Sequence, residues 1–314
     1  MLRDWIYKTL NSRGISEGLV EALIAATRQV SEYARQVEPL LAPESVFKAC
    51  RLAWMICILK NDDRVPIKPF SLGKTLTAYC LLYPLVDDFV DDPRTSLELR
   101  RHLMLLLSQS LMSHGGEENY ELRAFSSRIS RCIRDMYDGL STEYTVEQQR
   151  DFEQALQNVR MAEDFDLGPH ALSYITLEQK AAIKGASALL PASALLPRNA
   201  LMNDAVIVQL GFACQMVDDL QDCEEDVKSG IMTVFSQRLH DKSSLDDDTK
   251  RTLVFLDRLN QKMPTEALKT LTADLSYLAL EAVCHLPNHF SYEATHDLNK
   301  HLPVSTRYQM LLNL

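Results

Sequence analysis

Apolar residues recur at helical spacing through almost every segment of this chain, and convincing alternation of apolar and polar residues is absent. Residues 19–37 show the pattern plainly, with five side chains on one stripe of a helix of 3.6 residues per turn: Leu19, Leu23, Ala26, Val30 and Tyr33. Glycine and proline are sparse, at 10 and 12 of 314 residues, which disfavours a fold with many tight turns. We therefore predict an all-α protein.

The segments between turn signals give the expected helices. They cover residues 19–37, 44–60, 72–92, 97–113, 119–139, 146–165, 177–190, 199–226, 247–262 and 266–284. Residues 113–119 and 240–250 are expected to be polar surface loops. No shift in composition, flexible linker or internal repeat marks a domain boundary. Residues 1–314 are therefore expected to form a single helical domain.

Charge and cysteine content narrow the class of protein. The net charge of −10 argues against a nucleic-acid partner, because binding phosphates needs clustered Lys and Arg. The 7 cysteines are an odd number without a CxxC pair, which favours free thiols in a reducing compartment. The first residues lack the apolar core of a signal peptide, and no uninterrupted apolar run is long enough for a membrane span. We expect a cytoplasmic protein.

Two stretches concentrate carboxylates directly after an apolar run. They are LLYPLVDDFVDDPR at residues 81–94 and QMVDDLQDCEEDVKSG at residues 215–230. Helical spacing groups their side chains by face: Asp87 with Asp91, Asp88 with Asp92, and Asp218 with Asp222 and Asp226. Because like charges at this spacing repel, each face is expected to hold a positive partner.

Mg²⁺ fits that role, since it prefers hard oxygen ligands and often shares its shell with substrate phosphates. The two clusters together therefore predict a diphosphate bound through metal ions. The alternative for either cluster alone is a solvated acidic surface, which is the common state of a charged helix end. An EF-hand is excluded because neither cluster contains the DxDxDG loop.

The paired motifs DDFVD (87–91) and DDLQD (218–222) resemble the two aspartate-rich motifs of the class I isoprenoid synthases. The stretch GFACQMVDDLQD (211–222) is similar to that family's GxxxQxxDDxxD pattern, and DVKSGIMT (226–233) is similar to its continuation. The resemblance covers residues 70 to 235 and implies an all-helical bundle with a central active-site cavity. It also implies a prenyl diphosphate substrate and Mg²⁺ as the cofactor, with three ions expected.

The resemblance assigns roles to particular side chains. The catalytic residues would be Asp87, Asp88, Asp91, Asp218, Asp219 and Asp222. The metal ligands would be Asp87, Asp88, Asp91, Asp218, Asp222 and Asp226. The diphosphate would be bound by Lys184, Lys228, Arg307 and Tyr308.

The substrate pocket is expected to be lined by Tyr79, Tyr83, Phe212 and Gln215. Tyr79 and Tyr83 lie two turns and one turn before Asp87, and Phe212 lies seven residues before Asp219. Aromatic faces at these positions could stabilise an allylic cation. The alternative for each aromatic is an ordinary place in the core.

Within the family, the motifs favour cyclisation over chain elongation. Residues 42–51 lack the GGKRxRP-like stretch of an isopentenyl diphosphate site, although Lys48 and Arg51 carry charge, and Ile231 stands where elongating enzymes have a lysine. The second cluster has the ligand spacing of the terpene synthase NDxxSxxxE motif, and Arg307–Tyr308 resembles the RY pair of those enzymes. An Arg-Tyr pair also occurs by chance.

The sequence thus predicts a Mg²⁺-dependent terpene synthase acting on a C15 or C20 prenyl diphosphate, namely farnesyl or geranylgeranyl diphosphate. Two alternatives stay open: a chain-elongating prenyltransferase, and a non-catalytic subunit of one. Because dimers are common in the family, the resemblance makes a homodimer possible.

Overall fold

The computed structural model describes residues 16–60, 71–92, 94–96, 98–100, 102–103, 127–166, 176–196 and 203–294, with backbone alone at residues 91 and 158–166. Within these ranges the regular structure is helical and contains no strand. The prediction of an all-α chain is therefore confirmed.

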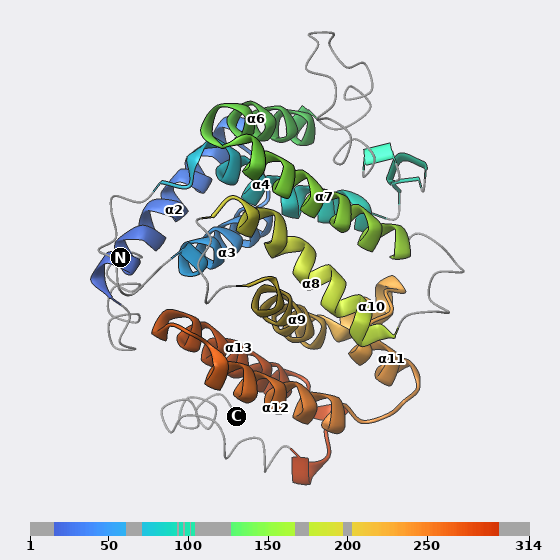
Figure 1. Cartoon of the computed structure of the whole chain (residues 1–314). Coiled ribbons are helices and arrows are strands. Elements are labelled where there is room, and N and C mark those ends of the chain that lie inside the picture. Colours follow the sequence, from blue (N-terminus) through green and yellow to red (C-terminus); the bar gives the residue numbers. More distant parts are fainter. Residues whose placement is uncertain are drawn as a thin grey trace. The chain divides into compact units, whose positions relative to one another are not determined.

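The helices follow one another along the chain as coloured in Figure 1. They are α2 (Glu17–Val37), α3 (Pro43–Lys60), α4 (Gly73–Asp91), α6 (Ser127–Glu143), α7 (Val146–Asp166), α8 (Leu177–Ala194), α9 (Asp204–Gln221), α10 (Cys223–Ser229), α11 (Val234–His240), α12 (Asp246–Lys262), α13 (Glu266–His285) and the 3₁₀ turn η3 (Pro287–His289).

Several of the expected boundaries were wrong. Helices α6 and α8 each end four residues later than expected, and α11 was not expected. The helix predicted over 199–226 is two helices, because the backbone at Asp222 (φ −98°, ψ 5°) leaves the helical region between α9 and α10. Hydrogen bonds still cross this break, from Asp222 N to Asp218 O (3.0 Å) and from Asp226 N to Asp222 O (2.9 Å). The loop predicted at 240–250 ends early, since α12 begins at Asp246. Most of the segments expected at 97–113 and 113–119 lies outside the described residues.

Contacts between Cα atoms divide the chain into two compact units. Unit 1 is Met1–Tyr174, Ala186–Ile207 and Thr265–Ala267, and unit 2 is Ile175–Gly185, Val208–Pro264 and Leu268–Leu314. The division passes through α8, α9 and α13, so these three helices contribute residues to both units. The single domain expected from the sequence stays a prediction.

In unit 1, α4 packs against α2, α3 and α6 (Figure 1). The crossing of α4 and α6 is close because Gly139 has no side chain. A Cβ at this position would lie 2.7 Å from the backbone nitrogen of Thr75. Glycine at position 139 therefore lets the two helix backbones approach.

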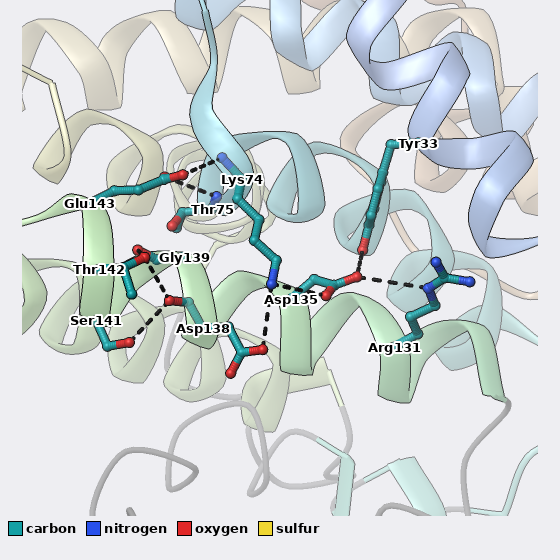
Figure 2. A network of polar contacts seen from close by, with 10 residues as sticks. All are labelled: Tyr33, Lys74, Thr75, Arg131, Asp135, Asp138, Gly139, Ser141, Thr142 and Glu143. Atoms are coloured by element: carbon teal, nitrogen blue, oxygen red, sulfur yellow. Dashed lines mark hydrogen bonds and ion pairs between the residues drawn. The ribbon is translucent and has the colours of Figure 1, made fainter.

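The first turn of α4 is capped by a side chain of α6 (Figure 2). Glu143 Oε1 accepts a hydrogen bond from the backbone N–H of Lys74 (2.7 Å), and Oε2 accepts one from that of Thr75 (3.3 Å). A carboxylate at a helix N-terminus accepts hydrogen bonds from N–H groups that have no partner within the helix. Its negative charge also interacts favourably with the positive end of the helix dipole. This cap fixes the start of the helix that carries Asp87 and Asp88.

A second contact in Figure 2 ties three helices of unit 1 together around Asp135 of α6. Tyr33 of α2 donates a hydrogen bond to its Oδ2 (2.9 Å), and Lys74 Nζ of α4 lies 3.3 Å from its Oδ1. Burial raises the pKa of Tyr33, and the neighbouring Cys132 and Asp135 raise it further. Burial opposes the charge of Lys74, but contacts with Asp135 and Asp138 outweigh it and raise its pKa. Tyr33 stays a neutral donor and Lys74 a cation.

In unit 2, α8 and α9 meet at two glycines. A Cβ at Gly185 would overlap the carbonyl group of Gly211, so any larger residue forces the two backbones apart. The helices that follow are joined by a tight link, in which Gly230 ends α10 at φ +72° and Thr233 starts α11. Thr233 and Ser236 form a capping box that fixes the first turn of α11.

Candidate functional site

The second carboxylate cluster lies in unit 2, on α9 and α10. Asp219 is its most buried member, at 7 % exposure, and its Oδ1 accepts a hydrogen bond from Gln215 Nε2 (2.6 Å) one turn earlier on α9. Burial raises the pKa of Asp219 to about 6, while the Gln215 hydrogen bond lowers it and the nearby charge of Asp218 raises it. Gln215, predicted as a pocket residue, therefore positions a carboxylate of the cluster.

Asp226 of α10 belongs to the same electrostatic group. Burial raises its pKa to about 7, and the negative charges of Asp219 and Asp222 raise it further. Thr233 partly opposes this by donating a hydrogen bond from Oγ1 to Asp226 Oδ2 (3.4 Å). The three carboxylates thus repel one another across the break between α9 and α10, and the cluster favours an added positive charge.

Two lysines of α8 provide part of that charge. Lys184 lowers the pKa of both Asp219 and Asp226, and Lys180 also lowers that of Asp219. Lys180 Nζ further donates a hydrogen bond to the carbonyl oxygen of Met232 (3.2 Å). The predicted Lys184 is therefore brought to the cluster. Lys180 was not predicted, although its place one turn before Lys184 on the same face of α8 was a usable signal.

Local backbone contacts at glycines set the positions of Lys184 and of Thr233. Close packing at Gly185 and Gly211 sets α8 against α9 next to Lys184. The left-handed Gly230 turns the chain so that Thr233 reaches back to Asp226. Both glycines of the crossing lie within stretches that resemble the synthase family.

The first carboxylate cluster lies on the last turn of α4 in unit 1, and two residues of α3 contact it. Lys48 Nζ lies 3.5 Å from Asp87 Oδ2 and 4.0 Å from Asp88 Oδ1, and Ser45 donates a hydrogen bond to Asp88 Oδ2 (2.7 Å). The charge of Lys48 was apparent in the sequence but its partners were not, because the contact joins two helices that are far apart along the chain.

Asp92 follows the last turn of α4 as its C-cap, where the chain becomes extended (ψ 116°). Its carboxylate accepts hydrogen bonds from the side chain and backbone of Arg94, which lower its pKa to about 2. Arg100 donates a hydrogen bond to the Asp92 carbonyl oxygen (2.8 Å), so it holds the turn after the helix. The side chain of Asp91 lies outside the described residues.

The remaining predicted diphosphate ligands are not brought to either cluster by a described contact. Lys228 is exposed on α10, where its charge lowers the pKa of Glu224 after the larger effect of a hydrogen bond with His289 (2.7 Å). Arg307 and Tyr308 lie outside the described residues. Their roles stay predictions.

The predicted pocket aromatics lie in packed surroundings. Tyr79 is buried in unit 1, with its ring edge-on to Phe152 (centroids 5.9 Å apart). Its hydroxyl donates to the carbonyl oxygens of Ser187 (3.2 Å) and Ala188 (3.1 Å) of α8. Pro191 explains this contact, because it lacks the N–H that would bond Ser187 O within the helix. Tyr79 is placed as a core residue, and its pocket role stays a prediction.

Tyr83 and Phe212 are both half-buried. Tyr83 lies close enough to Tyr79 for its charge to raise the pKa of that residue, after the larger effect of burial. In unit 2, the ring of Phe212 packs edge-on against Phe255 of α12 (centroids 5.1 Å apart). Neither placement tests whether the ring faces a substrate.

The chemistry of the second cluster suits Mg²⁺. In the described part of the chain no group of three or more His, Cys, Asp or Glu side chains is placed so that it could hold a metal ion. Mg²⁺ does not need one, because it is commonly held by one or two carboxylates together with water and substrate phosphates. Asp218, Asp219, Asp222 and Asp226 offer only oxygen ligands, and their mutual repulsion is relieved by a cation. The ligands of the cluster are therefore of the type that Mg²⁺ takes, and the metal site itself stays a prediction.

All 7 cysteines are free and lie in the described residues. Burial raises the pKa of Cys223, between the two parts of the second cluster, to about 12, which leaves it a neutral thiol. None of the described helices is both long and apolar enough to cross a membrane. Comparison of the chain with protein-family models, with curated proteins and with solved structures finds no match in any of the three.

Proposed function

We propose that this chain is a Mg²⁺-dependent class I terpene synthase, which ionises farnesyl or geranylgeranyl diphosphate and cyclises or rearranges the resulting cation. The proposal joins the motif resemblance to one observation in unit 2. Lys184 of α8 lies within electrostatic reach of Asp219 and Asp226, so carboxylates and a cation gather at one place. That combination binds a metal ion through oxygen and a phosphate through nitrogen.

The chain's own groups would act on the diphosphate end of the substrate. Asp218, Asp222 and Asp226 would hold Mg²⁺, which neutralises a leaving diphosphate and so lowers the barrier to C–O cleavage. Lys184 would donate to the same phosphate oxygens, and its neighbour Lys180 would add a second positive charge. Asp87 and Asp88, with Asp91, would form the other carboxylate set that the resemblance assigns to the metal ions.

One contact favours cyclisation over elongation. An elongating enzyme needs cations that are available for a second diphosphate. Lys48, the first basic residue where such a site would begin, lies 3.5 Å from Asp87 Oδ2 and 4.0 Å from Asp88 Oδ1. Its charge is therefore already opposed by carboxylates. This supports a single-substrate reaction.

The test is incubation of purified protein and Mg²⁺ with geranyl, farnesyl or geranylgeranyl diphosphate, each with and without isopentenyl diphosphate. Products are identified by mass spectrometry. The proposal predicts hydrocarbons or alcohols from a single C15 or C20 substrate. Longer diphosphates, formed only when isopentenyl diphosphate is present, would establish the chain-elongating alternative. If no substrate were turned over, the chain would be assigned as a non-catalytic subunit.

Two variants locate the activity. Asp87→Ala with Asp88→Ala should abolish turnover while circular dichroism stays that of a folded helical protein, because both side chains lie at the accessible end of α4. Glu225→Gln is the matched control, since Glu225 is an exposed carboxylate beside Asp226 with no assigned role. Full activity in the folded double variant would refute the assignment of the first cluster.

A further inference from the structure

A basic hollow lies in unit 2, away from both carboxylate clusters in the sequence. It has a volume of about 650 Å³ and is lined by four cations of α11 and α12: Arg238, Lys250, Arg251 and Arg258. Such a gathering is unusual in a chain whose net charge is −10. Cations held together repel one another unless an anion lies between them.

Two of these cations are held in place by a buried carboxylate. Asp248 is only 2 % exposed, and its Oδ2 accepts a hydrogen bond from Arg238 Nε (2.6 Å). Its Oδ1 accepts one from Arg251 Nη2. Each contact occupies one edge of a guanidinium, which carries five N–H donors, so further donors remain for a ligand. The contact with Asp248 is also the largest cause of the raised pKa of Arg238.

The other two cations have no such partner. Lys250 and Arg258 are exposed, and neither side chain makes a hydrogen bond or ion pair with another residue of the described chain. Asp247 is the one acidic residue among those that line the hollow, and the buried Asp248 contacts two of the four cations. Four positive charges thus face two negative ones, which leaves an excess of positive charge at this place.

Part of the lining of the hollow is apolar. Val254 and Phe255 of α12 line it together with the cations, and Val254 is 43 % exposed. Phe255 is held by its edge-on contact with Phe212 of α9. A ring fixed in this way can pack against an apolar part of a ligand.

We infer that this hollow binds a phosphorylated small molecule, with its phosphate groups held by the arginines and lysine and its apolar part on Val254 and Phe255. Guanidinium groups match phosphate oxygens with paired hydrogen bonds. The volume of about 650 Å³ lies within the range of small-molecule sites. The inference does not depend on the proposed function, because no residue of the hollow belongs to either carboxylate cluster.

The experiment is calorimetric titration of the full chain with inorganic diphosphate and with inorganic phosphate, in EDTA. Removing divalent metal prevents binding through metal ions at the carboxylate clusters, and the variants below separate binding at the hollow from binding at Lys184. We expect diphosphate to bind more tightly than phosphate, because it can span two of the cations. Equal and immeasurably weak binding of both anions would overturn the inference.

Variants assign the signal. Lys250→Gln and Arg258→Gln should each weaken diphosphate binding roughly fivefold, and together roughly thirtyfold, because each removes one charge at contact distance. Neither residue has a partner in the described chain, so folding should be unaffected. Lys262→Gln is the control, since Lys262 is an exposed cation on the last turn of α12 outside the hollow. Equal weakening by the control would mean that only overall charge matters.

A final experiment distinguishes binding of a free phosphorylated ligand from binding of a lipid headgroup. The same variants are mixed with phosphatidylcholine vesicles that contain phosphatidic acid, and sedimentation measures the bound fraction. We expect the chain to bind free diphosphate and not to sediment with the vesicles beyond the level of the double variant. Sedimentation that depends on Lys250 and Arg258, without binding of free diphosphate, would replace a small-molecule site by a membrane surface.

Discussion

Buried and half-buried carboxylates in unit 2 differ in how their charge is opposed. Asp248 accepts hydrogen bonds from two guanidinium groups, so cations lie directly against its carboxylate. Asp219 has one neutral amide as its hydrogen-bond donor and shares its surroundings with other carboxylates. The pKa of Asp226 is raised further than that of Asp219, to about 7. Asp219 and Asp226 therefore favour the binding of a proton or a metal ion over remaining charged with no cation bound.

The raised pKa values of Asp219 and Asp226 predict that the stability of the metal-free protein depends on pH. The raised pKa values mean that the folded chain binds more protons than the unfolded chain between about pH 4 and pH 7. The free energy of unfolding should therefore fall as pH rises through that window. Asp226→Asn should recover roughly 1–2 kcal/mol of this loss at higher pH, after allowance for solvent screening.

Urea unfolding in EDTA at about pH 5 and about pH 8 measures this effect. Glu225→Gln serves as the control, because its exposed carboxylate should change the pH slope little. Adding Mg²⁺ at the higher pH should stabilise the wild-type chain more than Asp226→Asn. A variant with the wild-type slope would show that Asp226 is not under electrostatic strain.

A second prediction concerns Tyr79 and the proline that leaves its acceptor free. Tyr79→Phe should cost about 1–2 kcal/mol of stability, because the carbonyl oxygen of Ser187 would lose its buried donor. In a Pro191→Ala background the same change should cost less, since the backbone N–H restored at position 191 can bond that oxygen within α8. Additive losses in the double-mutant cycle would contradict this explanation of the contact.

At the scale of helices, periodicity predicted most of what the structure contains. The segments expected at 19–37, 44–60 and 146–165 match α2, α3 and α7 to within two residues at each end. The break at Asp222 was not predictable in the same way, because apolar spacing continues across it and no glycine or proline marks it. The start of α12 was predicted to within one residue, but the loop prediction extended to residue 250 because the charged first turn of α12, which contains the buried Asp248, looks like a loop.

The same limit applies to the candidate site. The motifs identified the carboxylates, and the family pattern identified Lys184. Contacts between helices that are far apart in sequence, such as Lys48 with Asp87 and Tyr33 with Asp135, could not be predicted, because they depend on how helices cross. Amphipathic spacing shows which face of a helix is buried but not what lies against it.

The crossing of α8 and α9 gives a prediction at this scale. Gly185→Ala should destabilise the protein by about 3 kcal/mol, because the new methyl group would overlap the backbone of Gly211 and force the helices apart. It should also weaken Mg²⁺-dependent stabilisation, since Lys184 would move with α8. Thermal unfolding with and without Mg²⁺ measures both effects.

The control for this crossing is Glu178→Gln, which changes a residue on the first turn of the same helix, away from the two glycines. It should alter stability by less than about 0.5 kcal/mol. If Gly185→Ala behaved like the control, the close packing of the two glycines would not be what sets α8 against α9.

For the molecule as a whole, the structure confirms an all-α chain and divides it into two compact units. The division into two units was not apparent in the sequence, because no linker separates them and three helices contribute residues to both. Each aspartate-rich motif belongs to a different unit, the first to unit 1 and the second to unit 2. The proposed reaction requires carboxylates of both motifs, so it makes activity a property of the intact chain.

The most direct test of the central proposal is release of inorganic diphosphate from farnesyl and geranylgeranyl diphosphate by the purified chain, as Mg²⁺ is varied. We predict release that needs Mg²⁺, is retained in Glu225→Gln, and falls by roughly a hundredfold or more when Asp218→Asn and Asp222→Asn remove two metal ligands. Release from either substrate that is unchanged in the folded double variant, or absent from the wild-type chain at every Mg²⁺ concentration, would contradict the proposal.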